Sequence, residues 1–259
     1  MKHQLEISSA AVGVRYVSYT YPGAVDALFE VSFQVAAGSR TGLIGPNGAG
    51  KSTLLLCLLG LLPGFSGAIE VGGTKVLPDH DLTELRRRAG LVFQDPDDQL
   101  FNPTVLEDVA FGPLNLGFSQ KESETRARES LSRVGVSQEL FDRPPHRLSR
   151  GQKRRVAIAG VLAMEPSLLL LDEPTSDLDP RGRRELANLL ADLPTTMIIA
   201  SHDLEFVLES CDQVVVMDAG KTVARGLPPK IMSDRDCMHE HGLEVPHSLT
   251  AHSVPHHES

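Results

Sequence analysis

The sequence predicts an α/β fold with a mostly parallel sheet, an antiparallel β layer near its beginning and an inserted helical subdomain. Short apolar runs that end in polar or turn residues recur along the chain, and alternating apolar and polar residues fill its first part. A charged, helix-favouring stretch between about residues 104 and 165 indicates the insertion. The 259 residues suit one large domain, and an apolar content of 41% provides a sizeable core.

The strands follow from two different patterns. Residues 12–20 and 28–36 alternate in polarity around the turn sequence YPGAVD, so we expect half-buried antiparallel strands there. Continuous apolar runs are typical of strands buried on both faces of a parallel sheet. These runs are TGLIG (41–45), LLLLD (168–172), MIIAS (197–201) and QVVVMD (213–218). We expect this domain to cover residues 1–228 and a His-rich, flexible tail to follow over 229–259.

Composition excludes several classes of protein. The formal net charge of −9 argues against a sequence-independent nucleic-acid binder, because such binding requires a basic surface. Three widely spaced cysteines without a CxxC pair indicate neither a disulfide framework nor a zinc site, and they fit a reduced, cytosolic compartment. No apolar run reaches the roughly 18–20 residues that cross a bilayer, and the first ten residues lack the apolar core of a signal peptide.

The segment GPNGAGKST follows a predicted strand and opens a helix. Its glycines allow the backbone to curl so that successive N–H groups point inward, and the helix N-terminus adds positive charge to the same cup. Lys51 would reach the β- and γ-phosphates of a nucleotide, and Ser52 would ligate Mg²⁺. The alternative is a glycine-rich turn of purely structural use. The phosphate-binding candidates are Gly45, Pro46, Asn47, Gly48, Ala49, Gly50, Lys51, Ser52 and Thr53.

Acidic residues end a second buried strand, in LLLLDEP. A parallel sheet delivers functional groups at the carboxyl ends of its strands, so Asp172 and Glu173 are expected near the phosphate cup. Asp172 would hold Mg²⁺ through water, and Glu173 would polarise the attacking water. His202 ends a third strand, in MIIASHD, and is a candidate for contacting the γ-phosphate. Solvated acids and a structural histidine are the alternatives.

Four sequence motifs resemble those of a known protein family. GPNGAGKST, LSRGQKRRVAIAG, LLLLDEPTSDLD and ASHD resemble, in this order, the ATP-binding subunits of ABC transporters, over about residues 10–228. VFQDPDDQLF, VLEDVAFGPLNLG and GQKRRVAIAGVLAMEP are similar to the energy-coupling-factor branch, particularly its cobalt and nickel importers. The resemblance implies a P-loop NTPase core that binds ATP and Mg²⁺ and hydrolyses ATP to drive transport.

The resemblance also assigns roles to residues outside the cup. Tyr21 would stack on adenine, with a hairpin core residue as the alternative. Gln94 would sense Mg²⁺ and the attacking water while its loop contacts a membrane partner; an exposed loop glutamine is the alternative. The signature segment would cap the γ-phosphate from an opposite subunit, and its serine also reads as a simple helix cap. Its residues are Leu148, Ser149, Arg150, Gly151 and Gln152.

Two features of these loops need separate interpretation. The family usually has glycine where this chain has Arg150, and an arginine cannot adopt every backbone conformation open to glycine. The signature loop is therefore expected to be held slightly differently, with ATP-dependent closure retained. Asp95, Asp97 and Asp98 resemble a metal site in composition, but we interpret them as a solvated loop beside Gln94.

The resemblance implies an assembly. Ser149 would complete a site built around Lys51 of another copy, so two chains would face each other head to tail, as a homodimer or with a related ATPase. Residues 176–179, SDLD, would run along the seam or simply cap the next helix. The dimer would sit on the cytoplasmic face of the cell membrane. Its partners would be a transmembrane coupling subunit and a substrate-binding membrane subunit, with no nucleic acid.

The sequence gives less information on the transported substrate. Imidazole suits Ni²⁺, Co²⁺ or Zn²⁺, and the tail is rich in it, although a solvated low-complexity tail is the alternative. Cobalt or nickel is preferred over a vitamin on this ground and on the resemblance. A soluble ABC-type ATPase and a regulatory module without hydrolysis fit less well, because the chain has one nucleotide domain and keeps both Glu173 and His202. The tail histidines are His239, His241, His247, His252, His256 and His257.

Overall fold

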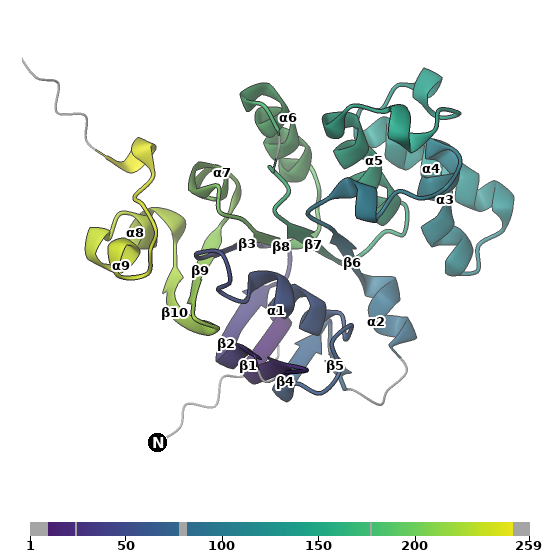
Figure 1. Cartoon of the computed structure of the whole chain (residues 1–259). Helices are drawn as coiled ribbons and strands as arrows, with labels where there is room; N and C mark the ends of the chain where they lie inside the picture. The colour runs from purple at the N-terminus through teal and green to yellow at the C-terminus, as the bar shows by residue number, and fades with distance from the viewer. Residues whose placement is uncertain (1–9, 24, 78–81, 177, 251–259) are drawn as a thin grey trace, which may run out of the picture.

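A computed structural model describes residues 10–23, 25–77, 82–176 and 178–250, which fold around two sheets (Figure 1). The first has the order β2-β1-β4-β5 and is antiparallel throughout. Alternate side chains of its long strands are buried, as the period of two in the sequence predicts. Its strands are β1 (Ala10–Tyr21), β2 (Val25–Ala36), β4 (Ser66–Val71) and β5 (Thr74–Val76).

The second sheet has the order β10-β9-β3-β8-β7-β6, and its pairs are parallel except for β9 with β10. The continuous apolar runs form its buried centre, with every residue of β8 buried. This confirms the predicted mostly parallel sheet. Its strands are β3 (Arg40–Ile44), β6 (Ala89–Val92), β7 (Leu168–Asp172), β8 (Thr196–Ala200), β9 (Gln213–Asp218) and β10 (Lys221–Gly226).

The predicted helical insertion is present between β6 and β7 and lies to one side of the sheets (Figure 1). Each of its three helices starts at a hydroxyl residue whose side chain accepts a hydrogen bond from the first turn: Thr104, Ser119 and Ser149. They share one apolar core with the sheet. The helices are α3 (Val105–Asn115), α4 (Gln120–Arg133) and α5 (Arg150–Leu162), and short 3₁₀ turns cover Pro96–Asp98, Gln138–Leu140 and Pro145–Arg147.

Four further helices connect the strands of the two sheets: α1 (Lys51–Leu58), α2 (Thr83–Arg88), α6 (Pro180–Ala191) and α7 (Leu204–Ser210). Two strand glycines allow helices to approach the parallel sheet closely. A Cβ at Gly42 of β3 would lie 2.3 Å from a methyl carbon of Val207 in α7, and one at Gly90 of β6 would lie 2.2 Å from a methyl carbon of Val161 in α5. No helix in the described ranges is long and apolar enough to cross a membrane.

The prediction of a flexible tail from residue 229 is wrong for its first part, because residues 228–232 and 235–240 form helices. Met232, Met238 and Leu243 are buried in a third apolar cluster together with Val207 of α7 and Val214 of β9. Burial of these side chains offsets the entropy lost on ordering the segment. It contains α8 (Pro228–Met232), α9 (Arg235–Glu240) and a 3₁₀ turn at His247–Leu249, whereas residues 251–259 lie outside the described part of the chain.

Candidate nucleotide site

The glycine-rich segment forms a tight turn between β3 and α1. Gly50 caps α1 with φ of 96°, a left-handed conformation that favours glycine. A Cβ on Gly50 would lie 2.5 Å from the carbonyl oxygen of Ala27, and one on Gly45 would lie 2.0 Å from that of Met217. Side chains are therefore excluded at both positions, and the backbone N–H groups at the start of α1 line a cup with a positive helix end.

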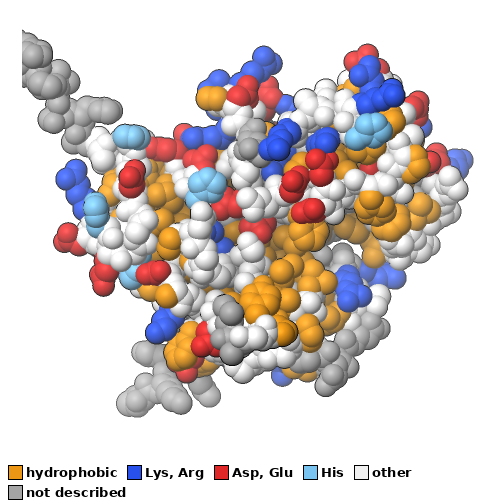
Figure 2. Space-filling view, in the orientation of Figure 1, with side chains coloured by type: hydrophobic (Ala, Val, Ile, Leu, Met, Phe, Trp, Pro, Cys, Tyr) orange, Lys and Arg blue, Asp and Glu red, His pale blue; other side chains and the backbone are white. Residues whose placement is uncertain are grey.

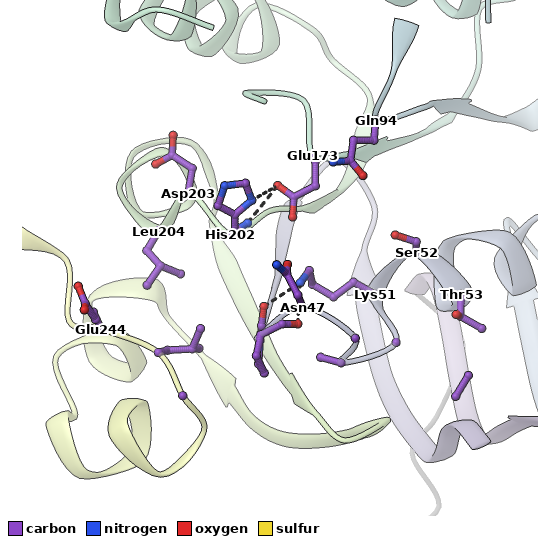
Figure 3. A pocket seen from close by; sticks show the side chains of 18 of the residues that line it. Asn47, Lys51, Ser52, Thr53, Gln94, Glu173, His202, Asp203, Leu204 and Glu244 are labelled. Carbon is purple, nitrogen blue, oxygen red and sulfur yellow. Dashed lines mark hydrogen bonds and ion pairs between the residues drawn. The ribbon is translucent and has the colours of Figure 1, made fainter. Parts of the chain in front are cut away.

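Lys51 lies inside this cup. Its side chain folds back so that Nζ donates to the carbonyl oxygens of Gly45, at 2.7 Å, and Pro46, at 3.1 Å (Figure 3). Lys51 is only 7% exposed. Burial lowers the pKa of the ammonium, while the carboxylates of Glu173 and Asp172 act in the opposite direction. The arrangement holds a cation beside the backbone donors, as binding of a phosphate requires.

Asp172 ends β7 beside Ser52. Burial raises the pKa of Asp172, while a hydrogen bond from the Ser52 side chain and the charges of Lys51 and Arg154 act to lower it. Its Oδ1 atom is buried without a hydrogen-bond partner among the described residues. A hydroxyl beside an unpartnered carboxylate oxygen is a donor set that suits Mg²⁺, which prefers hard oxygen ligands. The side chains present thus fit the ion that a nucleotide brings.

Glu173 and His202 form a pair across β7 and β8. Oε2 of Glu173 lies 2.7 Å from the ring Nδ1 of His202 and accepts from the His202 backbone N–H at 3.2 Å. Glu173 is 7% exposed, whereas the His202 side chain is 63% exposed. Glu173 also has φ of 45°, an uncommon conformation for a residue other than glycine, and its N–H donates to Ala200 at 2.8 Å. The contacts of Glu173 with His202 and Ala200 therefore hold its carboxylate toward the cup.

Gln94 and Tyr21 lie at other parts of the same pocket. Gln94 follows β6 and is exposed, and it points toward the region of Glu173 (Figure 3). The hydroxyl of Tyr21 lies 3.2 Å from Oγ1 of Thr53, and the Tyr21 ring packs edge-on against Tyr19 with centroids 5.0 Å apart. Tyr21 thus lines the pocket and packs within its hairpin, and its stacking on adenine stays a prediction.

These residues surround one pocket of about 1060 Å³. Of the predicted site it gathers Tyr21, residues 45–53, Gln94, Glu173 and His202. Sequence reasoning missed one wall, made by residues 203–205 and 242–247. Glu205 and Ser248 join the two segments, because the Ser248 backbone N–H donates to Oε1 of Glu205 at 3.1 Å and its hydroxyl donates to Oε2. Residues 203–205 follow His202 directly in the sequence, so their position beside a predicted site residue could have identified them.

The signature segment lies elsewhere. Ser149, Gly151 and Gln152 line a second pocket of about 650 Å³, together with Leu178 and Asp179. The Ser149 hydroxyl accepts from the Gln152 N–H at 3.3 Å, and the Ser149 N–H donates to the Gln152 side chain at 2.9 Å. The helix-cap interpretation therefore describes this chain, and within it Ser149 does not join Lys51. Asp177, in the expected seam segment, lies outside the described residues.

Metal binding was one of two interpretations of the histidine-rich tail, and the described residues do not favour it. They contain no group of three or more histidine, cysteine, aspartate or glutamate side chains that could hold a metal ion. Figure 2 shows histidines spread over the C-terminal segment rather than gathered at one point. His241 instead lies 3.0 Å, through Nδ1, from Oδ2 of Asp218. His252, His256 and His257 fall outside the described part.

Comparison with known proteins identifies the family. The model of the ABC transporter family matches residues 28–176. The energy-coupling factor transporter ATP-binding protein EcfA2 of Streptococcus sanguinis is 46% identical, over 91% of this chain and 88% of its own length. The solved structure of cbiO1 from Clostridium perfringens, part of the ABC transporter complex cbiONQ, is 39% identical with a TM-score of 0.79, covering 90% of this chain and 94% of that one.

A second solved structure resembles the chain at lower identity. It is a dimeric ATP-binding cassette in a post-hydrolysis state, bound to ADP and Pi, with 28% identity and a TM-score of 0.76 over 84% of this chain and 98% of that one. These likenesses confirm the predicted fold and the predicted class of enzyme, an ATPase coupled to transport. The chain belongs to the ABC transporter family, as an ATP-binding subunit of the energy-coupling-factor type.

Proposed function

We propose that this protein hydrolyses ATP to energise the import of cobalt or nickel ions through a separate membrane complex. One observation carries the ATPase part: a single pocket brings the phosphate cup of Lys51, the Ser52 hydroxyl and the Glu173–His202 pair together, beside the Asp172 carboxylate at the end of β7. The choice of ion rests on the sequence strings shared with cobalt and nickel importers.

Each group in the pocket has a chemical task. Lys51 and the N–H groups at the start of α1 bind the phosphates of ATP. Ser52 and Asp172, with Gln94, would hold Mg²⁺, which neutralises charge that develops on the phosphates. Glu173 orients and polarises the attacking water, since His202 and the strand end fix its carboxylate. His202, whose side chain is largely exposed, contacts the γ-phosphate in this proposal.

Two chains are needed for turnover in this proposal. Ser149 lines a different pocket from Lys51, so the signature segment of one chain would cap the nucleotide of its partner, either a second copy or a related ATPase. Shape similarity to a dimeric cassette supports this arrangement. ATP binding would close the pair, and hydrolysis with phosphate release would reopen it.

The closing motion would act on membrane subunits bound near Gln94, on the cytoplasmic face of the cell membrane. Affinity purification from the native host, with mass spectrometry and ATPase assays, tests this assignment. Recovery of a transmembrane coupling protein with a metal-type substrate subunit supports metal import. A vitamin-type substrate subunit overturns the choice of ion, and recovery of soluble partners alone overturns the transport role while the ATPase assignment stands.

A further inference from the structure

Arg154, on the first turns of the signature helix α5, is buried against the loop that carries Gln94. Its guanidinium donates from Nη1 to the carbonyl oxygen of Phe93 at 2.7 Å and from Nη2 to that of Gln94 at 2.5 Å. Arg154 is 3% exposed. Because the guanidinium is a rigid fork, two bonds to successive carbonyls fix the orientation of the backbone on which Gln94 sits.

Further contacts join the same two segments. The Gln99 side chain donates from Nε2 to the carbonyl oxygen of Ala157 in α5 at 3.0 Å, and its Oε1 accepts from the Phe93 N–H at 3.3 Å. Lys153 Nζ lies 2.5 Å from Oδ1 of Asp97. Asp97 of the acidic loop therefore pairs with a lysine of the signature helix, and α5 and residues 93–99 make one connected unit.

Because Arg154 is buried, loss of its hydrogen bonds would carry a large energetic cost. A buried charge is costly unless it is paired and hydrogen-bonded, and a carbonyl that loses its buried donor is costly as well. The charge of Arg154 also acts on Asp172: burial raises the pKa of this carboxyl, and the nearby guanidinium opposes part of that rise. The same guanidinium thus holds the Gln94 backbone and acts on the carboxylate that we assign to Mg²⁺.

We propose that Arg154 is a positioning residue for ATP hydrolysis: it sets the place of Gln94 at the metal and water site and ties that place to the helix that begins with the signature segment. A displacement of α5 would then move Gln94 with it. This inference rests on the proposed role of Gln94 in the same site, so the test must separate the two.

A double-mutant cycle on the full-length chain makes the separation. The variants are Arg154→Lys, Gln94→Ala and the combination, with kcat, KM for ATP and the Mg²⁺ dependence measured for each. Arg126→Lys is the matched control, because Arg126 is also an arginine of the helical subdomain but pairs with Glu165 at 3.1 Å. Thermal melting checks that each variant is folded, and Arg154→Gln replaces Arg154→Lys if the lysine variant melts below the assay temperature.

We expect Arg154→Lys to lower kcat about 10-fold with little change in KM, since misplacement of a catalytic group by even about 1 Å is costly. In the Gln94→Ala background the same change should lower kcat by less than about twofold. Hydrogen exchange of residues 93–99 should speed up in Arg154→Lys and stay unchanged in Arg126→Lys.

Three results overturn the inference. Equal losses of kcat from Arg154→Lys in both backgrounds would reduce Arg154 to a structural residue, while the role of Gln94 would stand. An unchanged kcat in folded Arg154→Lys would have the same meaning. An unchanged kcat in Gln94→Ala would overturn both the inference and the proposed role of Gln94.

Discussion

The nucleotide pocket and the signature pocket are both built at the start of a helix, but they treat the helix end differently. At α1 the capping position is Gly50, which supplies no side-chain cap in the described structure. At α5 the side chains of Ser149 and Gln152 satisfy each other's backbone N–H groups. The first helix end is therefore open to an anion, and the second is closed by its own residues.

This difference suggests an order of events. The cup at α1 has its lysine and its N–H groups in place without any second chain, so under the proposed function it would bind phosphates alone. The Ser149 hydroxyl already accepts a hydrogen bond from Gln152, and it must keep or exchange that bond when a phosphate arrives. Binding at the first pocket would thus precede engagement of the second.

Replacing Glu173 with Gln, in the nucleotide pocket, should have the largest effect on ATP turnover. The amide cannot act as a base toward water, so kcat should fall about 10²- to 10⁴-fold with ATP affinity retained. A closed dimer should accumulate, visible by size-exclusion chromatography with ATP. Glu209→Gln, on the exposed side of α7, is the control. Turnover at the normal rate would remove Glu173 from the mechanism.

Replacing Lys51 with Ala tests whether the cup binds phosphate. Loss of charged hydrogen bonds should weaken ATP binding about 10- to 100-fold, measured by calorimetry in a full-length variant. The wild-type lysine is buried against its own loop, so thermal melting should accompany the measurement. Unchanged affinity would contradict the phosphate-cup assignment.

Mixing two inactive variants tests whether the pockets act in different chains. Lys51→Ala and Ser149→Ala should each lack turnover, because every site of such a homodimer contains a defect. A mixed pair has one intact site, so mixing equal amounts should restore roughly a quarter of wild-type ATPase activity if copies exchange freely. Failure to restore activity, although subunit exchange is shown by pull-down, would contradict the assignment of the two pockets of one site to different chains.

The smallest expected effect concerns stability. The folded-state pKa of Asp172 is raised, mainly by burial, so the folded protein favours the neutral carboxyl and loses stability as pH rises through that pKa. Asp172→Asn mimics the neutral form and should raise the melting temperature at pH 7 by about 2–4 °C per kcal/mol gained, and by less near pH 4. Measurements without nucleotide or Mg²⁺ test this, with exposed Asp192→Asn as the control. A lower melting temperature at pH 7 would contradict it.

The sequence predicted the parts of the pocket whose requirements are local. Gly50 has a positive φ and lies close to Ala27, so its position requires glycine. Lys51 follows directly, and the motif can be recognised from these adjacent residues. The strand that ends in Asp172, directly before Glu173, could be predicted because its apolar run is continuous. Such patterns depend on residues adjacent in the chain, and the fold class followed from them.

Features that depend on distant contacts were not predictable. Helices α8 and α9 are five and six residues long, too short for a helical period to be recognised. Their burial depends on α7 and β9, and the pocket wall at 242–247 depends on the same packing. The separation of Ser149 from Lys51 is also a property of the tertiary arrangement, and it was expected only through the family resemblance, which implied that Ser149 acts on another copy.

Two glycines of the parallel sheet set the distance between its strands and the helices packed on them. Gly90 lets α5, which follows Ser149, rest on β6, and Gly42 lets α7, which follows His202, rest on β3. An alanine at either glycine would act as a spacer one methyl group thick, lifting one helix away from the sheet while leaving every functional group unchanged. In the proposed dimer, the fit between the two facing chains would therefore depend on residues inside the sheet as well as on those at the surface.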